Sequence, residues 1–200
     1  MDIRQTDPGG LRQRLSQVLA ARPLLRGLLR ALGAGGFCFV LAGAGLLDGP
    51  VPLALAPVCV LPFGPAAICA YLGAAAGYAV FWGLSAALEP VAAGFLLLAG
   101  SCLLADLVPD EQGWLASAAA GGIYALLGVI FVLRADGGLQ AALQLILRLV
   151  LLTLSVRMLS PAPANARLRP YAAAVCLLAG LVRVQLPFGV PLAVILAAAI

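Results

Sequence analysis

The sequence predicts an all-α, polytopic integral membrane protein, a helix bundle of about six to seven membrane segments, some of them short or broken by proline. Of its 200 residues, 64% are apolar and only 10% are charged, whereas charged residues make up roughly 25% of a typical globular domain. The apolar residues also form long runs, separated by brief breaks rich in proline, glycine and charge. Such a chain has too little polar surface to coat a water-facing globule, so we expect it in a bilayer.

Residues 1–30 form the only long polar stretch, and we expect a basic cytoplasmic segment there, ahead of a transmembrane helical domain at 31–200. All twelve basic residues are arginines, and six of them precede residue 31. Arg22, Arg26 and Arg30 recur every four residues beside the first apolar run. This stripe is either a positive-inside signal that keeps the N-terminus on the cytoplasmic side of the cell membrane, or a site for anionic lipid headgroups. In the second case each arginine contributes about 1 kcal/mol of attraction to the membrane surface. No nucleic-acid partner is expected, because no basic, aromatic-rich soluble domain accompanies the stripe.

Eight apolar runs follow one another along the chain. A helix rises about 1.5 Å per residue, so about 20 residues are needed to cross a bilayer. Breaks such as Asp48-Gly49-Pro50 and Glu89-Pro90 have the composition that ends helices. The predicted runs are residues 31–47, 51–61, 66–88, 91–105, 114–133, 139–159, 171–182 and 191–200.

The run at 51–61 is too short to cross alone and contains two prolines. We expect it to be re-entrant or to lie at the surface, with protein covering its backbone. The N-terminus and the loop with Arg157, Arg167 and Arg169 both favour the cytoplasm. Five good spans separate these two basic regions, and an odd number of crossings would place them on opposite sides of the membrane. Therefore either 51–61 joins its neighbours to make another crossing, or 139–159 lies in the interface.

The chain ends at Ile200, inside an apolar run that has no polar flank. A terminal carboxylate in hydrocarbon is costly, so we expect these residues to be the front part of a longer protein. A tail that just reaches the far interface is the alternative.

One charge is predicted to lie near the middle of an apolar segment. Gln144 and Arg148 are four residues apart on one face of the 139–159 helix. A charge at the bilayer centre costs a few kcal/mol or more unless it faces protein, water or headgroups. Glu89 and Asp106 are the candidate partners of Arg148. Three interpretations are open. The 139–159 helix lies in the membrane interface, Arg148 and its partner form a structural ion pair inside the bundle, or the two residues belong to a substrate or proton path.

Two short motifs concern helix packing and helix entry. Gly73 and Gly77 form a Gly-x-x-x-Gly that lets helices approach closely, so we expect packing within the chain, with a homo-oligomer through this face as the alternative. Pro62-Phe63-Gly64 recurs as Pro187-Phe188-Gly189, each time before a new apolar run. These are two helix-entry turns or, alternatively, two broken segments of a midplane site as in repeat-built transporters.

The absence of histidine excludes several enzyme classes. No Ser-His or Cys-His nucleophile pair and no His-ligated zinc or haem can be built from this sequence. The five cysteines are scattered inside apolar runs and form no C-x-x-C, as expected for packed apolar side chains. We therefore expect no catalytic site, metal or cofactor in these residues.

The features of the chain follow one another in a recognisable order. A basic N-terminal region comes first, followed by the helix-entry turn Pro62-Phe63-Gly64 and by a helix that contains Gly73, Gly77 and Tyr78, and a string of short spans comes last. Over about residues 24–200 this order resembles the N-terminal membrane region of the stage II sporulation protein E family. In that family a regulatory segment and a metal-dependent serine/threonine phosphatase domain follow, and the phosphatase acts on an anti-anti-sigma factor. The resemblance implies an anchor at the division septum that supports self-association and meets septal proteins.

A second hypothesis is a small stand-alone transporter subunit, similar in length and span count to the substrate-binding components of energy-coupling-factor vitamin transporters. It predicts a bound small molecule that is lost when Arg148 or Glu89 is changed. The anchor hypothesis predicts that more chain follows Ile200 and that Arg148 tolerates replacement by leucine.

Overall fold

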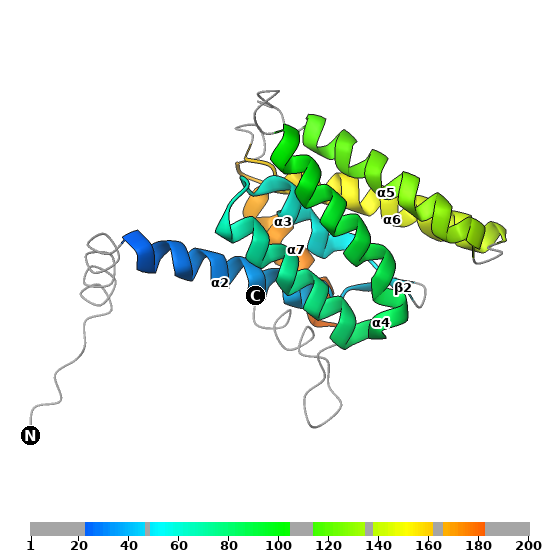
Figure 1. Cartoon of the computed structure of the whole chain (residues 1–200), viewed down its shortest axis with the longest axis horizontal. Coiled ribbons are helices and arrows are strands. Elements are labelled where there is room, and N and C mark those ends of the chain that lie inside the picture. Colours follow the sequence, from blue (N-terminus) through cyan, green and yellow to red (C-terminus); the bar gives the residue numbers. More distant parts are fainter. Residues whose placement is uncertain (1–22, 47–48, 105–113, 135–137, 162–165, 183–200) are drawn as a thin grey trace, which may run out of the picture.

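The computed structural model describes residues 23–46, 49–104, 114–134, 138–161 and 166–182, which fold into a helix bundle with a small β-hairpin (Figure 1). Its mostly helical architecture confirms the all-α part of the predicted fold class. Within these ranges three helices, α2, α4 and α6, are long and apolar enough to cross a membrane. In chain order the elements are α2 (Pro23–Leu41), β1 (Gly45–Leu46), β2 (Gly49–Pro50), the 3-10 turn η1 (Pro52–Ala54), α3 (Leu55–Val60), α4 (Pro65–Leu104), α5 (Trp114–Arg134), α6 (Leu139–Leu159) and α7 (Arg169–Leu181).

The first helix begins and ends earlier than predicted. α2 starts at Pro23 and ends at Leu41, not near residue 47. Beyond it the backbone tightens, because the N–H groups of Gly43 and Ala44 donate to carbonyls only three residues back. The chain then enters a two-stranded antiparallel hairpin in which Gly45 pairs with Pro50. Glycine favours such a change because it loses the most conformational freedom in a helix.

The long helix α4 folds back on itself at Gly83, which takes φ 78° and ψ 163° inside the run. Residues 65–82 form its first arm and residues 84–104 its second. The arms lie side by side: the Tyr71 hydroxyl donates to the Val91 carbonyl at 3.4 Å, and the Tyr71 and Phe95 rings are 6.4 Å apart. The predicted break at Glu89-Pro90 is therefore wrong. A left-handed backbone is open to glycine without a steric penalty, so the chain turns at Gly83 and Glu89 lies within the second arm.

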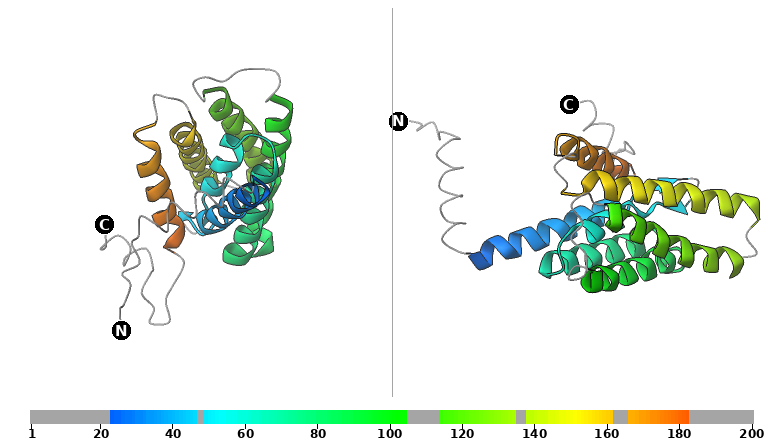
Figure 2. Two further views of the ribbon diagram at one scale, coloured as in Figure 1. Left: turned by 90° about the vertical axis from the view of Figure 1, so that its left-hand side faces the viewer. Right: turned by 90° about the horizontal axis from the view of Figure 1, so that it is seen from above.

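The short segment at 51–61 lies at the centre of the bundle. Residues 51–58, which include η1 and the start of α3, are all buried. α3 contacts α2, α4, α5 and α6, and Figure 2 shows it enclosed by the longer helices. The expectation of a short segment whose backbone is covered by protein is confirmed, and the surface position is excluded.

α2 runs parallel to the first arm of α4 and packs most extensively against it. The order of contacts gives the direction: Gly73 meets Gly35 midway along the arm, and the Trp82 indole donates to the Ala42 carbonyl at the end of the arm, at 2.9 Å. α7 also runs parallel to α2, because Ala173 shares a groove with Ala34 while Gly180, further along α7, approaches the Val40 backbone.

The ends of α3 and α6 and the start of α7 lie together. Leu61, Leu159 and Arg169 line one groove with Gly33 of α2. The 51–61 segment thus returns the chain to the end of the bundle from which α2 runs.

Candidate functional site

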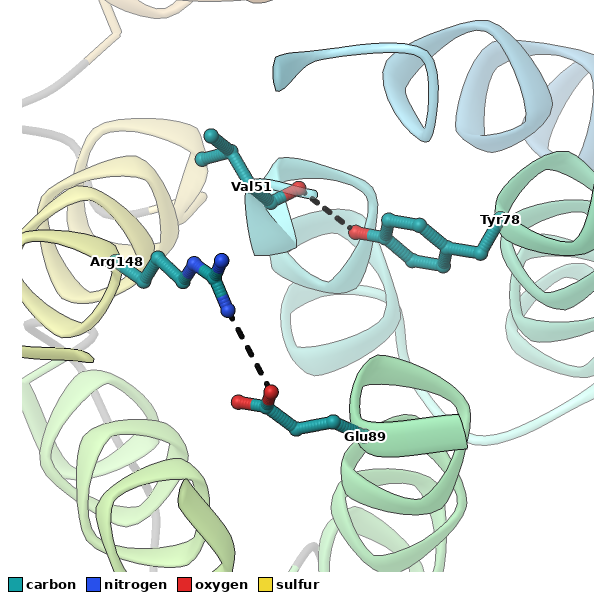
Figure 3. Close-up of polar contacts among 4 residues, drawn as sticks. All are labelled: Val51, Tyr78, Glu89 and Arg148. Atoms are coloured by element: carbon teal, nitrogen blue, oxygen red, sulfur yellow. Dashed lines mark hydrogen bonds and ion pairs between the residues drawn. The ribbon is translucent and has the colours of Figure 1, made fainter. Parts of the chain in front are cut away.

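An ion pair joins α6 to the second arm of α4 inside the bundle. Arg148 Nη1 lies 3.5 Å from Glu89 Oε2, and the two side chains are only 13% and 18% exposed. Figure 3 shows the two side chains pointing toward each other from facing helices. Of the two partners considered for Arg148, the structure brings Glu89 to it, whereas Asp106 lies outside the described residues. The helix α6 places Arg148 against protein, which favours the buried pair over an interfacial helix.

Two further residues complete the surroundings of this pair. The buried Tyr124 side chain of α5 lies next to both the Glu89 carboxylate and the Arg148 guanidinium. Gly49 of the β-hairpin lies against Arg148 Nη2 so closely that a Cβ there would overlap it. Four elements, α4, α5, α6 and β2, therefore meet at one cluster.

A second buried contact lies beside the cluster. The Tyr78 hydroxyl of α4 donates to the Val51 carbonyl at 2.9 Å and also meets the backbone of Ala54. Tyr78 is fully buried, and Figure 3 shows its hydroxyl reaching the chain just before η1. Non-helical backbone inside a membrane domain is stable only where its polar groups find partners, so Tyr78 secures the covered segment.

Replacing Tyr78 by phenylalanine is expected to destabilise the protein by about 1–3 kcal/mol, because a buried carbonyl loses its donor. Thermal or denaturant unfolding of the purified protein in detergent measures the change. Tyr71→Phe is the matched control, since Tyr71 is half-buried and its bond to Val91 is longer, at 3.4 Å. An equal loss in both variants would contradict the role given to Tyr78.

The remaining predicted residues are distributed as follows. Gln144 is half-buried one turn before Arg148. The backbone of the Pro62-Phe63-Gly64 motif leads into α4, where the Ile68 N–H donates to the Gly64 carbonyl at 3.1 Å. Arg26 and Arg30 are exposed on the half of α2 that projects from the bundle (Figure 1). Arg22 and Pro187-Phe188-Gly189 lie outside the described residues.

Gly73 and Gly77 lie at the contact of α4 with α2. A Cβ on Gly73 would overlap the Gly35 carbonyl, and one on Gly77 would lie 2.6 Å from the Phe39 carbonyl oxygen. Both contacts are with backbone of the same chain. They let two helices approach to a distance that any larger side chain would prevent.

Tyr124 and Gly49 were not among the predicted site residues. Tyr124 is an aromatic residue in an apolar helix, and its neighbours in the sequence do not indicate that its side chain lies at a charged pair. Gly49 belongs to the break Asp48-Gly49-Pro50, whose composition predicts only the end of a helix. The hydroxyl of Tyr124 within a largely apolar span is the signal that could have pointed to this residue, because such groups need partners in a membrane.

The chemistry available at the cluster is limited. Glu89 and Arg148 compensate each other's charge, and the Tyr124 side chain lies beside them. Every buried side-chain nitrogen and oxygen within the described ranges has a hydrogen-bond partner. In the same ranges no three His, Cys, Asp or Glu side chains gather where they could hold a metal ion.

The long apolar helices of the described residues support a helical membrane protein. Comparisons with protein-family models, characterised proteins and solved structures gave no match for this chain.

Proposed function

We propose that this chain is a non-catalytic membrane anchor and assembly module, in the specific form of the membrane region of a sporulation serine/threonine phosphatase that acts at the division septum. The phosphatase domain would follow residue 200. Its partners would be the bilayer, anionic lipid headgroups at the N-terminal arginines, a second copy of the chain and septal proteins. The sequence motifs at Pro62-Phe63-Gly64, Gly73, Gly77 and Tyr78 support the specific form.

The observation that carries the proposal is the saturated Glu89–Arg148 cluster. Each charge has the other as its partner, and the buried Tyr124 side chain lies next to both. A substrate site needs polar groups that await a ligand, whereas a structural pair has its partners already. The cluster thus has the character of a bundle-stabilising ion pair.

The proposed topology has about six to seven membrane segments in the cytoplasmic membrane, with the N-terminus in the cytoplasm. α2, the two arms of α4, α5, α6 and α7 account for six, and the returning segment at 51–61 for a seventh traverse. This order supports a cytoplasmic position for Arg157, Arg167 and Arg169 as well as for the N-terminal arginines, as the positive-inside rule requires.

A transporter subunit that binds a small molecule is the second candidate, and one observation favours it. The ion pair lies beside Gly49 and the short segment that begins at Val51, as substrate and ion sites of transporters lie beside broken helices near the midplane. In this case Glu89 and Arg148 would exchange partners with a ligand during transport.

The two functions are distinguished by purifying the chain from its natural membrane and analysing what is bound to it. The wild type is compared with the double variant Glu89→Gln, Arg148→Gln, in which the pair is replaced by neutral groups of similar size. Released small molecules are identified by mass spectrometry, and two differently tagged copies are tested for co-purification.

The anchor proposal expects that the tagged copies co-purify and that no compound distinguishes wild type from the double variant. A stoichiometric compound found in the wild type and missing from the folded double variant would contradict it and favour the transporter. Failure of the two tagged copies to co-purify would contradict the assembly part of the proposal.

A further inference from the structure

An apolar groove of about 580 Å³ opens on the bundle where α2, α3, α6 and α7 meet. Its volume lies within the range of about 300–1,000 Å³ found for small-molecule sites. Its walls are contributed by Ala34 and Phe37 of α2, Val60 and Leu61 of α3, Leu159 of α6 and Ala173 of α7.

One charged side chain lies in the lining of the groove, Arg169 at the start of α7. Arg30 of α2 precedes Ala34 by one helical turn and therefore lies on the same helix face, toward the same end. Among the described residues Glu89 is the single acid, and it is paired with Arg148. No carboxylate of the described chain therefore compensates Arg169 or Arg30.

The apolar lining and the arginine at one end together indicate which kind of molecule would bind in the groove. Apart from Arg169, the lining side chains have no hydrogen-bonding groups, so a peptide backbone would lie there unsatisfied, at a cost of several kcal/mol per group. A hydrocarbon chain needs no such partners. The Arg169 guanidinium at one end, which has no carboxylate partner among the described residues, favours an anionic group, and Arg pairs with phosphate through several N–H donors.

We propose that this groove is a binding site for one anionic phospholipid, with an acyl chain along the α2–α3–α7 walls and the phosphate at Arg169 and Arg30. The site is independent of the anchor and transporter alternatives, since it shares no residue with the Glu89–Arg148 cluster. It also differs from diffuse attraction of headgroups to the N-terminal stripe, because it holds a single lipid in a defined position.

The test is native mass spectrometry of the full chain released from vesicles of phosphatidylcholine with a minority of phosphatidylglycerol. Gly33→Leu fills the groove, and Gly36→Leu is its matched control. Both glycines are exposed on α2 and have open space where a Cβ would be added, but only Gly33 lines the groove. Arg169→Gln removes the charge at the groove, and Arg26→Gln removes an equal charge elsewhere on the same end.

The wild type and Gly36→Leu are expected to retain one phosphatidylglycerol, and Gly33→Leu to lose it. Arg169→Gln should lower retention about fivefold, the effect of one basic side chain at an anionic lipid, and Arg26→Gln should lower it much less. Retention by Gly33→Leu equal to that of Gly36→Leu would overturn the proposal. Equal retention of phosphatidylcholine from vesicles without phosphatidylglycerol would overturn the requirement for an anion, as would equal losses in the two arginine variants.

Discussion

Replacing Arg148 by leucine is expected to destabilise the protein by about 3 kcal/mol or more, because it leaves the carboxylate of Glu89 inside the bundle without its cation. Glu89 is only 18% exposed and has Arg148 as its ionic partner at 3.5 Å. This result differs from the tolerance of leucine that the sequence alone predicted for an anchor. The measurement is thermal unfolding in detergent, with Arg157→Leu, an exposed arginine of the same helix, as the matched control.

Replacing Glu89 and Arg148 by leucine together should restore most of the lost stability. Well-packed apolar residues often substitute for a buried ion pair at little or no net loss. The double variant is therefore expected to be more stable than Arg148→Leu. A double variant as unstable as the single one would show that Arg148 acts through another contact, such as Tyr124.

Enlarging Gly73 is the second change with a large expected effect. A Cβ at this position overlaps the Gly35 carbonyl, and backbone inside a packed helix pair cannot move aside as a flexible side chain does. Gly73→Leu is therefore expected to separate α2 from α4, with a loss of about 3 kcal/mol or of the folded state altogether.

Gly100→Ala is the control for this prediction within the same helix. A Cβ there would lie 3.5 Å from Ile123 Cδ1, an ordinary contact. Alanine also stabilises a helix by about 0.5–1 kcal/mol relative to glycine, so this variant should be as stable as the wild type or slightly more so. Gly73→Ala, tested beside it, should be clearly less stable; equal unfolding temperatures for the two would contradict close packing at Gly73.

Much of the helical architecture could be predicted from the sequence because lipid-exposed helices must be apolar along their whole length. The predicted 139–159 segment agrees with α6, and the 114–133 segment with α5 to within one residue. Glycines precede α6, and Ser160 and Pro161 follow it, so its ends have clear local signals. The sequence predicted either Glu89 or Asp106 as the partner of Arg148. The tertiary structure shows Glu89 in contact with it.

The reversal at Gly83 could not be predicted because nothing local marks it. The chain contains 23 glycines, most of them in apolar runs, and Gly83 has no polar or proline neighbour. Glu89 and Pro90 resemble a helix end far more closely. The carboxylate can nevertheless lie inside a helix because Arg148, far away in the sequence, compensates it. Boundaries set by tertiary contacts of this kind are not encoded in the local composition.

The proposal that this chain anchors a larger protein is tested most directly by the intact mass of the natural polypeptide in membranes of the source cells. The account predicts a polypeptide far heavier than the 20.3 kDa of these residues, whose additional mass includes a phosphatase domain. A natural polypeptide of 20.3 kDa, with no longer form in the same membranes, would contradict it.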